Sequence, residues 1–298
     1  MVSRTVSPST SRCYGVARVV TVWQLARSSF YAARHRRLHP SELGKRGPRV
    51  LSDAELLAEI RELLAAPVFA GEGYRKIWAR LRAKGVRTSK DRVLRLLREN
   101  QLLSPARQPE PGQSNPHEGT IITEAPDQMW GTDATATSTE LDGAVTVFAA
   151  VDHCTTECVG IHAVKRATRF EALEPIRQGV GEQFGALSAG RAEGLRLRHD
   201  HGSVYMSDDF QNEIKFLGIE PSPAFVHQPE GNGCIERFFR TLKEQLLWVR
   251  RFRDLEELQR ALIDFRQRYN KHWIVGRLNY RTPTQARQDF LIDLNIAA

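Results

Sequence analysis

The chain has 298 residues, of which 41% are hydrophobic, and a net charge of +8, so it is long enough to bury the cores of about two domains. Its four cysteines are too few and too scattered for a disulfide framework. No run of about 18 apolar residues could span a membrane, and no signal-peptide pattern opens the sequence. Disulfide-stapled and membrane-spanning proteins are therefore excluded, and we expect a cytoplasmic protein.

The charge is strongly segregated along the chain. Residues 1–112 hold 22 Lys and Arg against 9 Asp and Glu, residues 113–236 hold 8 against 19, and residues 237–298 hold 13 against 7. Basic flanks suit a protein that binds phosphates, whereas an acidic middle would repel DNA unless cations neutralised it. Ordinary solvated surface charge is the alternative, and it explains so strong an asymmetry poorly.

Residues 1–50 predict a basic region that is partly helical. Apolar residues within 19–25 favour a first helix, and residues 28–31 predict a turn into a second. The run Arg34-His35-Arg36-Arg37 is either a DNA-contacting patch or a solvated helix end. Residues 44–48 are typical of a linker.

Residues 51–104 predict a small helical DNA-binding domain. Ser52 and Glu55 form a capping box before an apolar stripe, a second amphipathic helix ends at Gly85, and Ser89 caps a third helix. A helix, a glycine turn and a basic helix make a helix-turn-helix, whose second helix would enter the major groove of DNA. A helical bundle with a solvated basic face is the alternative. The basic side chains expected to face DNA are Lys90, Arg92, Arg95 and Arg98.

Residues 105–126 contain five prolines and predict a linker. The segment that follows, residues 127–250, alternates strands with helices, and residues 251–298 predict a helical extension. The first three strands are joined by short turns before helices intervene, which indicates an α/β fold with a mixed sheet covered by helices. Strands are expected near 128–135, 145–151, 158–164, 195–200 and 219–224, and helices near 168–184, 207–217, 233–249 and 254–270.

Three carboxylates in this α/β segment are the candidate catalytic residues. Asp133 lies in an apolar and hydroxyl-rich strand, where a lone buried aspartate would be costly. Asp200 follows the fourth strand, and Glu236 opens a helix after 35 intervening residues. Two strands and a helix can deliver three carboxylates to two divalent cations for an in-line attack on a phosphodiester. With oxygen ligands and a phosphate substrate, Mg²⁺ is the expected metal, and Mn²⁺ could replace it.

The surroundings of these carboxylates resemble the D,D(35)E transposases and retroviral integrases, and most closely the second-frame (OrfB) transposases of bacterial insertion sequences. The resemblance runs from about residue 72 to about residue 285. It rests on Asp200-His201-Gly202-Ser203 with Tyr205, on Asn232 before Glu236, on Leu242-Lys243-Glu244, and on Gly73-Tyr74-Arg75-Lys76-Ile77, Tyr269-Asn270 and Asn279-Tyr280-Arg281-Thr282-Pro283.

The resemblance implies a ribonuclease H-like catalytic core preceded by a helix-turn-helix domain. It also implies a DNA transposase that cleaves the ends of a mobile element and transfers the freed 3′ hydroxyl to target DNA, working as a homo-oligomer. Lys243 matches the family's lysine seven residues after the glutamate, which implies contact with terminal DNA. Arg240 falls on the same helical face. Helix solubility is the alternative role for both side chains.

The family's full enzyme often gains an upstream helix-turn-helix and leucine zipper by frameshifting. No leucine heptad precedes residue 50, so an upstream-frame protein, or its frameshift fusion with this chain, is an expected partner. Two other functions stay open: a nuclease on the same fold that cuts without joining, and a decayed or repurposed DNA-binding protein.

Two further groups of residues could form a functional site, but a simpler structural interpretation is favoured for both. Asp152 also follows an apolar strand, but an aspartate before Thr155 and Thr156 is typical of a turn. Four residues could suggest zinc, although their spacing is not that of a zinc finger: His153, Cys154, Cys158 and His162. The sequence has no P-loop motif for ATP.

Overall fold

The computed structural model describes residues 4–38, 51–105, 123–223 and 232–297, and the chain divides into two compact units, residues 1–55 and 56–298. The first unit contains α1 (Gly15–Val22) and α2 (Arg27–Leu38). The turn predicted at residues 28–31 is wrong, because these residues lie inside α2. Serines are favoured at helix starts, where their hydroxyls accept hydrogen bonds from free backbone N–H groups. Ser28 and Ser29 therefore lie in the first turn of a helix instead of interrupting one. The predicted linker at residues 44–48 lies outside the described residues.

Three short helices follow: α3 (Asp53–Ala65), α4 (Tyr74–Ala83) and α5 (Lys90–Glu99). The predicted caps are confirmed. The Ser52 N–H donates to the Glu55 carboxylate at 2.7 Å, the Glu55 N–H donates to Ser52 Oγ at 3.2 Å, and the Arg92 N–H donates to Ser89 Oγ at 3.2 Å. Gly85 follows the C-terminal end of α4 and has a φ of +86°, a left-handed conformation that favours glycine. Val93, Leu96 and Leu97 are buried, as the apolar stripe predicts.

The second unit is built around a five-stranded mixed sheet in the order β3-β2-β1-β4-β5. β1 pairs antiparallel with β2 and parallel with β4, β2 pairs antiparallel with β3, and β4 pairs parallel with β5. The expected mixed sheet of an α/β fold is confirmed. The strands are β1 (Met129–Thr139), β2 (Gly143–Asp152), β3 (Cys158–Val164), β4 (Arg196–His199) and β5 (Glu220–Pro223).

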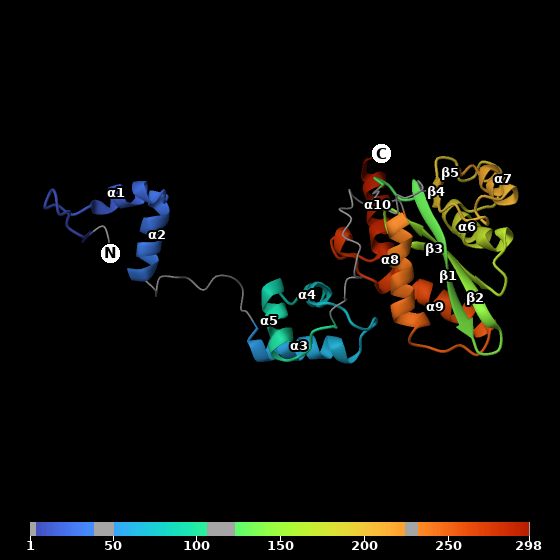
Figure 1. Ribbon diagram of the computed structural model, residues 1–298, viewed down its shortest axis with the longest axis horizontal. Coiled ribbons are helices and arrows are strands. Elements are labelled where there is room, and N and C mark those ends of the chain that lie inside the picture. The colour runs from blue at the N-terminus through green and yellow to red at the C-terminus, as the bar shows by residue number, and fades with distance from the viewer. Residues whose placement is uncertain (1–3, 39–50, 106–122, 224–231, 298) are drawn as a thin grey trace. The chain divides into compact units, whose positions relative to one another are not determined.

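Helices cover both faces of this sheet (Figure 1). Alternate residues of β2 pack on opposite faces of the sheet, since successive strand side chains point in opposite directions. Val147 and Ala149 pack with α8 and α9, whereas Phe148 and Ala150 pack with α6 and α7. The helices are α6 (Arg169–Phe184), α7 (Asp208–Phe216), α8 (Gly233–Leu242), α9 (Leu255–His272) and α10 (Pro283–Ala297), with a π turn η4 (Lys243–Leu247) and a 3₁₀ turn η5 (Gly276–Leu278).

Two elements differ from the expected ranges. β1 continues to Thr139, beyond the expected residue 135, because its threonines favour extended backbone and pair with β2 as far as Gly143. The helix expected over 233–249 is α8 followed by the π turn η4. Within the described ranges, no helix has the length and apolar character needed to cross a lipid bilayer.

Candidate active site

The sheet places Asp133 and Asp200 at corresponding positions on adjacent strands. β1 and β4 run parallel, and the last registered pair is Gly131 with Arg198. Asp133 lies two residues beyond Gly131, and Asp200 lies two residues beyond Arg198, just after β4 ends. Because residues in register on neighbouring parallel strands lie side by side, the two carboxylates emerge from neighbouring positions.

Glu236 reaches the same region from the first turn of α8. The start of this helix is fastened to β1, because Asn232 Nδ2 donates to the carbonyl oxygen of Thr132 at 3.4 Å. Gly131 makes this close approach possible. A Cβ there would lie 3.0 Å from Asn232 Oδ1 and 2.9 Å from His153 Nε2. The helix that carries Glu236 is thus fixed to the residue next to Asp133.

Asp133 experiences the charge of the other two carboxylates. Its pKa is raised to about 6, first by burial and then by the negative charges of Asp200 and Glu236. The Ala134 N–H, which donates to Asp133 Oδ1 at 2.8 Å, and the positive charge of Lys243 act in the opposite direction. All four charged side chains therefore influence one another in one region of the molecule.

Asp200 is held by its own turn and by the residues behind it. The Gly202 N–H donates to Asp200 Oδ1 at 2.8 Å, and His199 Nδ1 lies 2.7 Å from the Asp200 carbonyl oxygen. The buried His199 ring stacks on Tyr205, with a centroid distance of 5.7 Å, and burial lowers its pKa. His199 therefore supports the Asp200 turn as a packed, buried residue.

The residues present fit a divalent cation in charge and in donor type. Burial and, after it, the negative charges of Asp200 and Glu236 raise the pKa of Asp133, and carboxylate oxygens are the ligands that Mg²⁺ prefers. In the part of the chain that the structure describes, no three His, Cys, Asp or Glu side chains converge closely enough to form a ready metal cluster. The metal-binding roles of Asp133, Asp200 and Glu236 therefore stay predictions.

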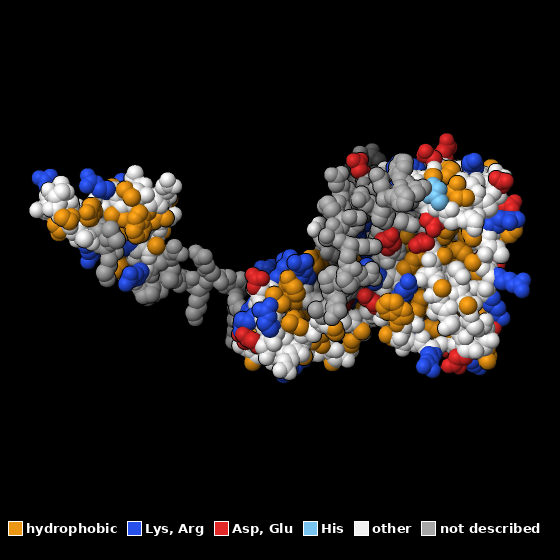
Figure 2. All heavy atoms as spheres, viewed as in Figure 1, with side chains coloured by type: hydrophobic (Ala, Val, Ile, Leu, Met, Phe, Trp, Pro, Cys, Tyr) orange, Lys and Arg blue, Asp and Glu red, His pale blue; other side chains and the backbone are white. Residues whose placement is uncertain are grey.

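The predicted DNA-contacting residues fall in two places. On α5, Arg95 and Arg98 are exposed and Arg92 is half-buried, whereas Lys90 lies over the Trp78 ring, with Nζ 4.5 Å from its centroid. Figure 2 shows Lys and Arg side chains gathered over the part of the chain that holds α4 and α5. Arg240 is exposed on α8 and lines a cavity.

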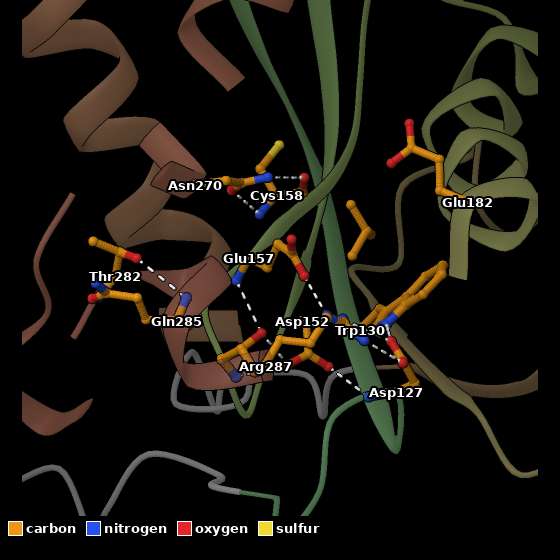
Figure 3. A network of polar contacts seen from close by, with 12 residues as sticks. Asp127, Trp130, Asp152, Glu157, Cys158, Glu182, Asn270, Thr282, Gln285 and Arg287 are labelled. Carbon is orange, nitrogen blue, oxygen red and sulfur yellow. Dashed lines mark hydrogen bonds and ion pairs between the residues drawn. The ribbon is translucent and has the colours of Figure 1, made fainter. Parts of the chain in front are cut away.

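A second acidic cluster near the carboxylates has a structural role (Figure 3). Asp152 is fully buried and accepts hydrogen bonds from the N–H groups of Thr155, at 2.7 Å, and Asp127, at 2.8 Å. The turn predicted at Asp152 is thus confirmed. Arg287 of α10 donates to Asp127 at 2.6 Å and forms an ion pair with Glu157, so it fastens the C-terminal helix to this turn. No local sequence pattern indicates this long-range pairing.

Two members of the suggested zinc group have other partners. His162 Nε2 lies 2.7 Å from a Glu171 carboxylate oxygen, and the Cys158 backbone exchanges hydrogen bonds with the Asn270 side chain. Burial raises the pKa of the Cys158 thiol to about 12, which opposes the thiolate that zinc needs.

The chain is similar to several known proteins. The chain matches the family models for an integrase core domain, over residues 217–283, and for an HTH-like domain, over residues 52–110. An Escherichia coli protein, the insertion element IS2A uncharacterized 48.2 kDa protein, is 25% identical over 94% of this chain and 66% of its own length. Transposase InsD of Escherichia coli insertion element IS2 is 25% identical over 92% of this chain and 91% of its own length.

Two solved structures are also similar. One is the simian T-cell lymphotropic virus intasome in complex with PP2A regulatory subunit B56 gamma. The match is 20% identical, covers 79% of this chain and 74% of that chain, and has a TM-score of 0.48. The other is the HTLV-2 integrase catalytic core domain in complex with magnesium. That match is 18% identical, covers 55% of this chain and 98% of that chain, and has a TM-score of 0.42.

Proposed function

We propose that the chain is an insertion-sequence transposase that cleaves DNA strands at the ends of a mobile element and joins them to target DNA, which its similarity to transposase InsD and its matches to the integrase core and HTH-like domain models support. One observation carries this proposal. The charges of Asp200, Glu236 and Lys243 all act on the half-buried Asp133, which lies in β1 beside the end of the parallel strand β4. A site of this composition suits transfer of a phosphodiester.

Each carboxylate has a distinct structural support in the proposed reaction. Asp133, Asp200 and Glu236 would hold two divalent cations, for which Mg²⁺ is expected and Mn²⁺ is the substitute. When bound, these cations would activate the attacking hydroxyl and stabilise the leaving oxygen. β1 fixes Asp133, the Gly202 N–H holds Asp200, and α8 carries Glu236 on a regular element. Rigid supports of this kind keep functional groups in a productive geometry.

Lys243 and the basic helices supply the contacts with DNA in this proposal. Lys243 is half-buried and acts on Asp133, so it lies where it could hold a phosphate near the reacting one. We propose double-stranded DNA of the element ends and of the target as substrate, and a homo-oligomer as the active assembly. An upstream-frame helix-turn-helix protein is a further proposed partner, and the cytoplasm is the proposed location.

The proposal is tested with three conservative variants: Asp133→Asn, Asp200→Asn and Glu236→Gln. Each should lower strand cleavage and joining by about a thousandfold or more, since losing one ligand removes several kcal/mol of transition-state stabilisation. DNA binding should persist. The measurement is cleavage and joining of a terminal-repeat duplex in Mg²⁺, in Mn²⁺ and in EDTA, where the wild type should be inactive.

Glu193→Gln is a suitable control, because Glu193 is an exposed carboxylate outside the candidate site. Activity near that of the wild type in any one of the three variants would remove that residue from the proposed site. A wild-type protein that cuts and yields no joined product would indicate a nuclease instead of a transposase.

A further inference from the structure

A cavity of about 430 Å³ opens between α8 and the segment that follows α9, within the size range of small-ligand sites. Three of the residues that line it are arginines, Arg237, Arg240 and Arg277, and no acidic side chain in the described part of the chain lines it. Arg240 and Arg277 form no ion pair with a carboxylate among the described residues. The cavity therefore concentrates positive charge beside the helix that carries Glu236.

The arginines come from two separate elements. Arg237 and Arg240 are three residues apart on α8, which makes them neighbours on the helix surface. Since each residue turns an α-helix by about 100°, the side chains of Glu236 and Arg237 point about 100° apart around the helix axis. Arg240, four residues after Glu236, points in a direction between those of Glu236 and Arg237. One helix thus presents a carboxylate to the candidate active site and guanidinium groups to the cavity.

Arg277 is held in place from the other side. It lies in η5, and its Nη2 donates to the carbonyl oxygen of His153 at 2.6 Å. The buried Cys234 thiol lines the cavity together with Arg237 and Arg277. Burial raises its pKa to about 11, and the positive charges of Arg277 and Arg237 oppose that rise. Arg237 and Arg277 therefore act on the same wall of the cavity.

The rest of the cavity wall is rigid and partly aromatic. The rings of Tyr269 and Trp273 are stacked, with centroids 6.0 Å apart, and Tyr269 is buried. Val275, another wall residue, is fixed by a backbone bridge to Arg281. A wall of this kind excludes water, and charges near it interact more strongly than they would in bulk water.

We propose that this cavity binds a backbone phosphate of the DNA strand that passes the three carboxylates. Guanidinium groups bind phosphate oxygens through paired N–H donors, and this cavity is lined by three of them. Arg240 lies about 6 Å along the helix axis from Glu236, so the bound phosphate would be a few nucleotides from the reacting one. This inference rests on the proposed function for the identity of the strand.

The test measures DNA binding by the full chain without catalysis. A labelled terminal-repeat duplex is titrated by fluorescence anisotropy in EDTA at several salt concentrations, with the wild type, Arg237→Gln and Arg277→Gln. A lost phosphate contact reduces the slope of log affinity against log salt by about 0.9. Over a fourfold rise in salt, each variant should therefore lose about three- to fourfold less affinity than the wild type.

Arg260→Gln is the matched control, because Arg260 is an exposed arginine on α9 that pairs with Glu256 and does not line the cavity. Arg277→Gln also removes the donor to His153, so thermal midpoints are recorded for every variant. The exposed Arg237 keeps the test informative if Arg277→Gln unfolds. Wild-type slopes in a folded Arg237→Gln protein would overturn the proposal.

A second arm separates DNA from a free anion. Inorganic phosphate replaces chloride at constant ionic strength, and the thermal midpoint is recorded. If phosphate stabilises the wild type and not Arg237→Gln, while the DNA slopes of the two agree, the cavity binds a free anion and the proposal fails. Because binding is measured in EDTA, a failure of strand joining would overturn the proposed function without altering this result.

Discussion

Asp133 and Asp152 lie on adjacent strands and differ in what surrounds their carboxylates. Asp152 accepts from the Thr155 N–H, the Thr155 hydroxyl and the Asp127 N–H. Asp133 accepts from the Ala134 N–H and lies near two other carboxylates. Burial raises the pKa of both carboxyls. At Asp152 three donors and the positive charge of Arg287 oppose the rise, whereas at Asp133 two neighbouring carboxylates add to it and leave negative charge that a cation could offset.

These environments predict opposite effects on stability. Asp133→Asn should raise the free energy of unfolding of the metal-free protein by about 1–2 kcal/mol. The raised pKa of Asp133 means that its ionised form is unfavourable in the fold at neutral pH, and asparagine is neutral. Asp152→Ala should lower the free energy of unfolding by about 1–3 kcal/mol, because buried donors lose their acceptor. Urea denaturation in EDTA measures both.

An Asp133→Asn protein that unfolds as easily as Asp152→Ala would contradict the assignment of Asp133 as an unsatisfied charge. The sequence could identify Asp133 as a carboxylate within a strand and Asp152 as one that follows a strand, and the turn residues after Asp152 indicated its role. It could not show Arg287, 135 positions later in the chain, joining Asp127 and Glu157, because no local pattern encodes a contact of that range.

At the scale of elements, α8 links the candidate active site to the rest of the second unit. Periodicity predicts one helix over 233–249, and the structure divides it after Leu242, where the π turn η4 begins. The wider turn keeps Leu246 and Leu247 buried while Trp248 is exposed. Such a local change of period is invisible to a pattern search that assumes 3.6 residues per turn.

Lys243 lies at this junction and predicts a result that separates a transposase from a simple nuclease. Lys243→Ala should fold normally, since a lysine that is not fully buried contributes little to stability. It should lose cleavage of a terminal-repeat duplex more than cleavage of a scrambled duplex, because an end-specific contact is lost. The measurements are the thermal midpoint and the two cleavage rates.

Glu244→Gln, one residue along the same turn, is a suitable neighbouring control for Lys243→Ala. Equal losses on the two duplexes would favour non-specific phosphate binding by Lys243. A thermal midpoint several degrees below that of the wild type would assign Lys243 a structural role instead.

At the scale of the whole molecule, the segregated charge has a structural counterpart in the basic helix α5. The loop before α4, however, packs against α9 and η4, which lie beside the sheet. Phe69 is buried against Phe265 and Trp273, and Gln245 exchanges two hydrogen bonds with the Ala70 backbone, at 2.9 and 3.0 Å. A fragment ending at residue 104 would expose Phe69, so DNA binding by α5 is better tested in the full chain.

The variant Arg98→Gln, alone and combined with Arg95→Gln, tests α5 as a DNA-binding helix. Both side chains are exposed, and the ion pair of Arg95 with Glu99 lies at the surface, so folding should be little affected. If α5 enters the major groove, affinity for the terminal repeat should fall more than affinity for scrambled DNA, by about 1–3 kcal/mol for an arginine that reads a base. Lys165→Gln, which removes an exposed lysine from the β3 end of the sheet, is the control. Mobility-shift titrations with both duplexes at two salt concentrations make the comparison, and unchanged affinity for both would leave α5 as the solvated face of a helical bundle.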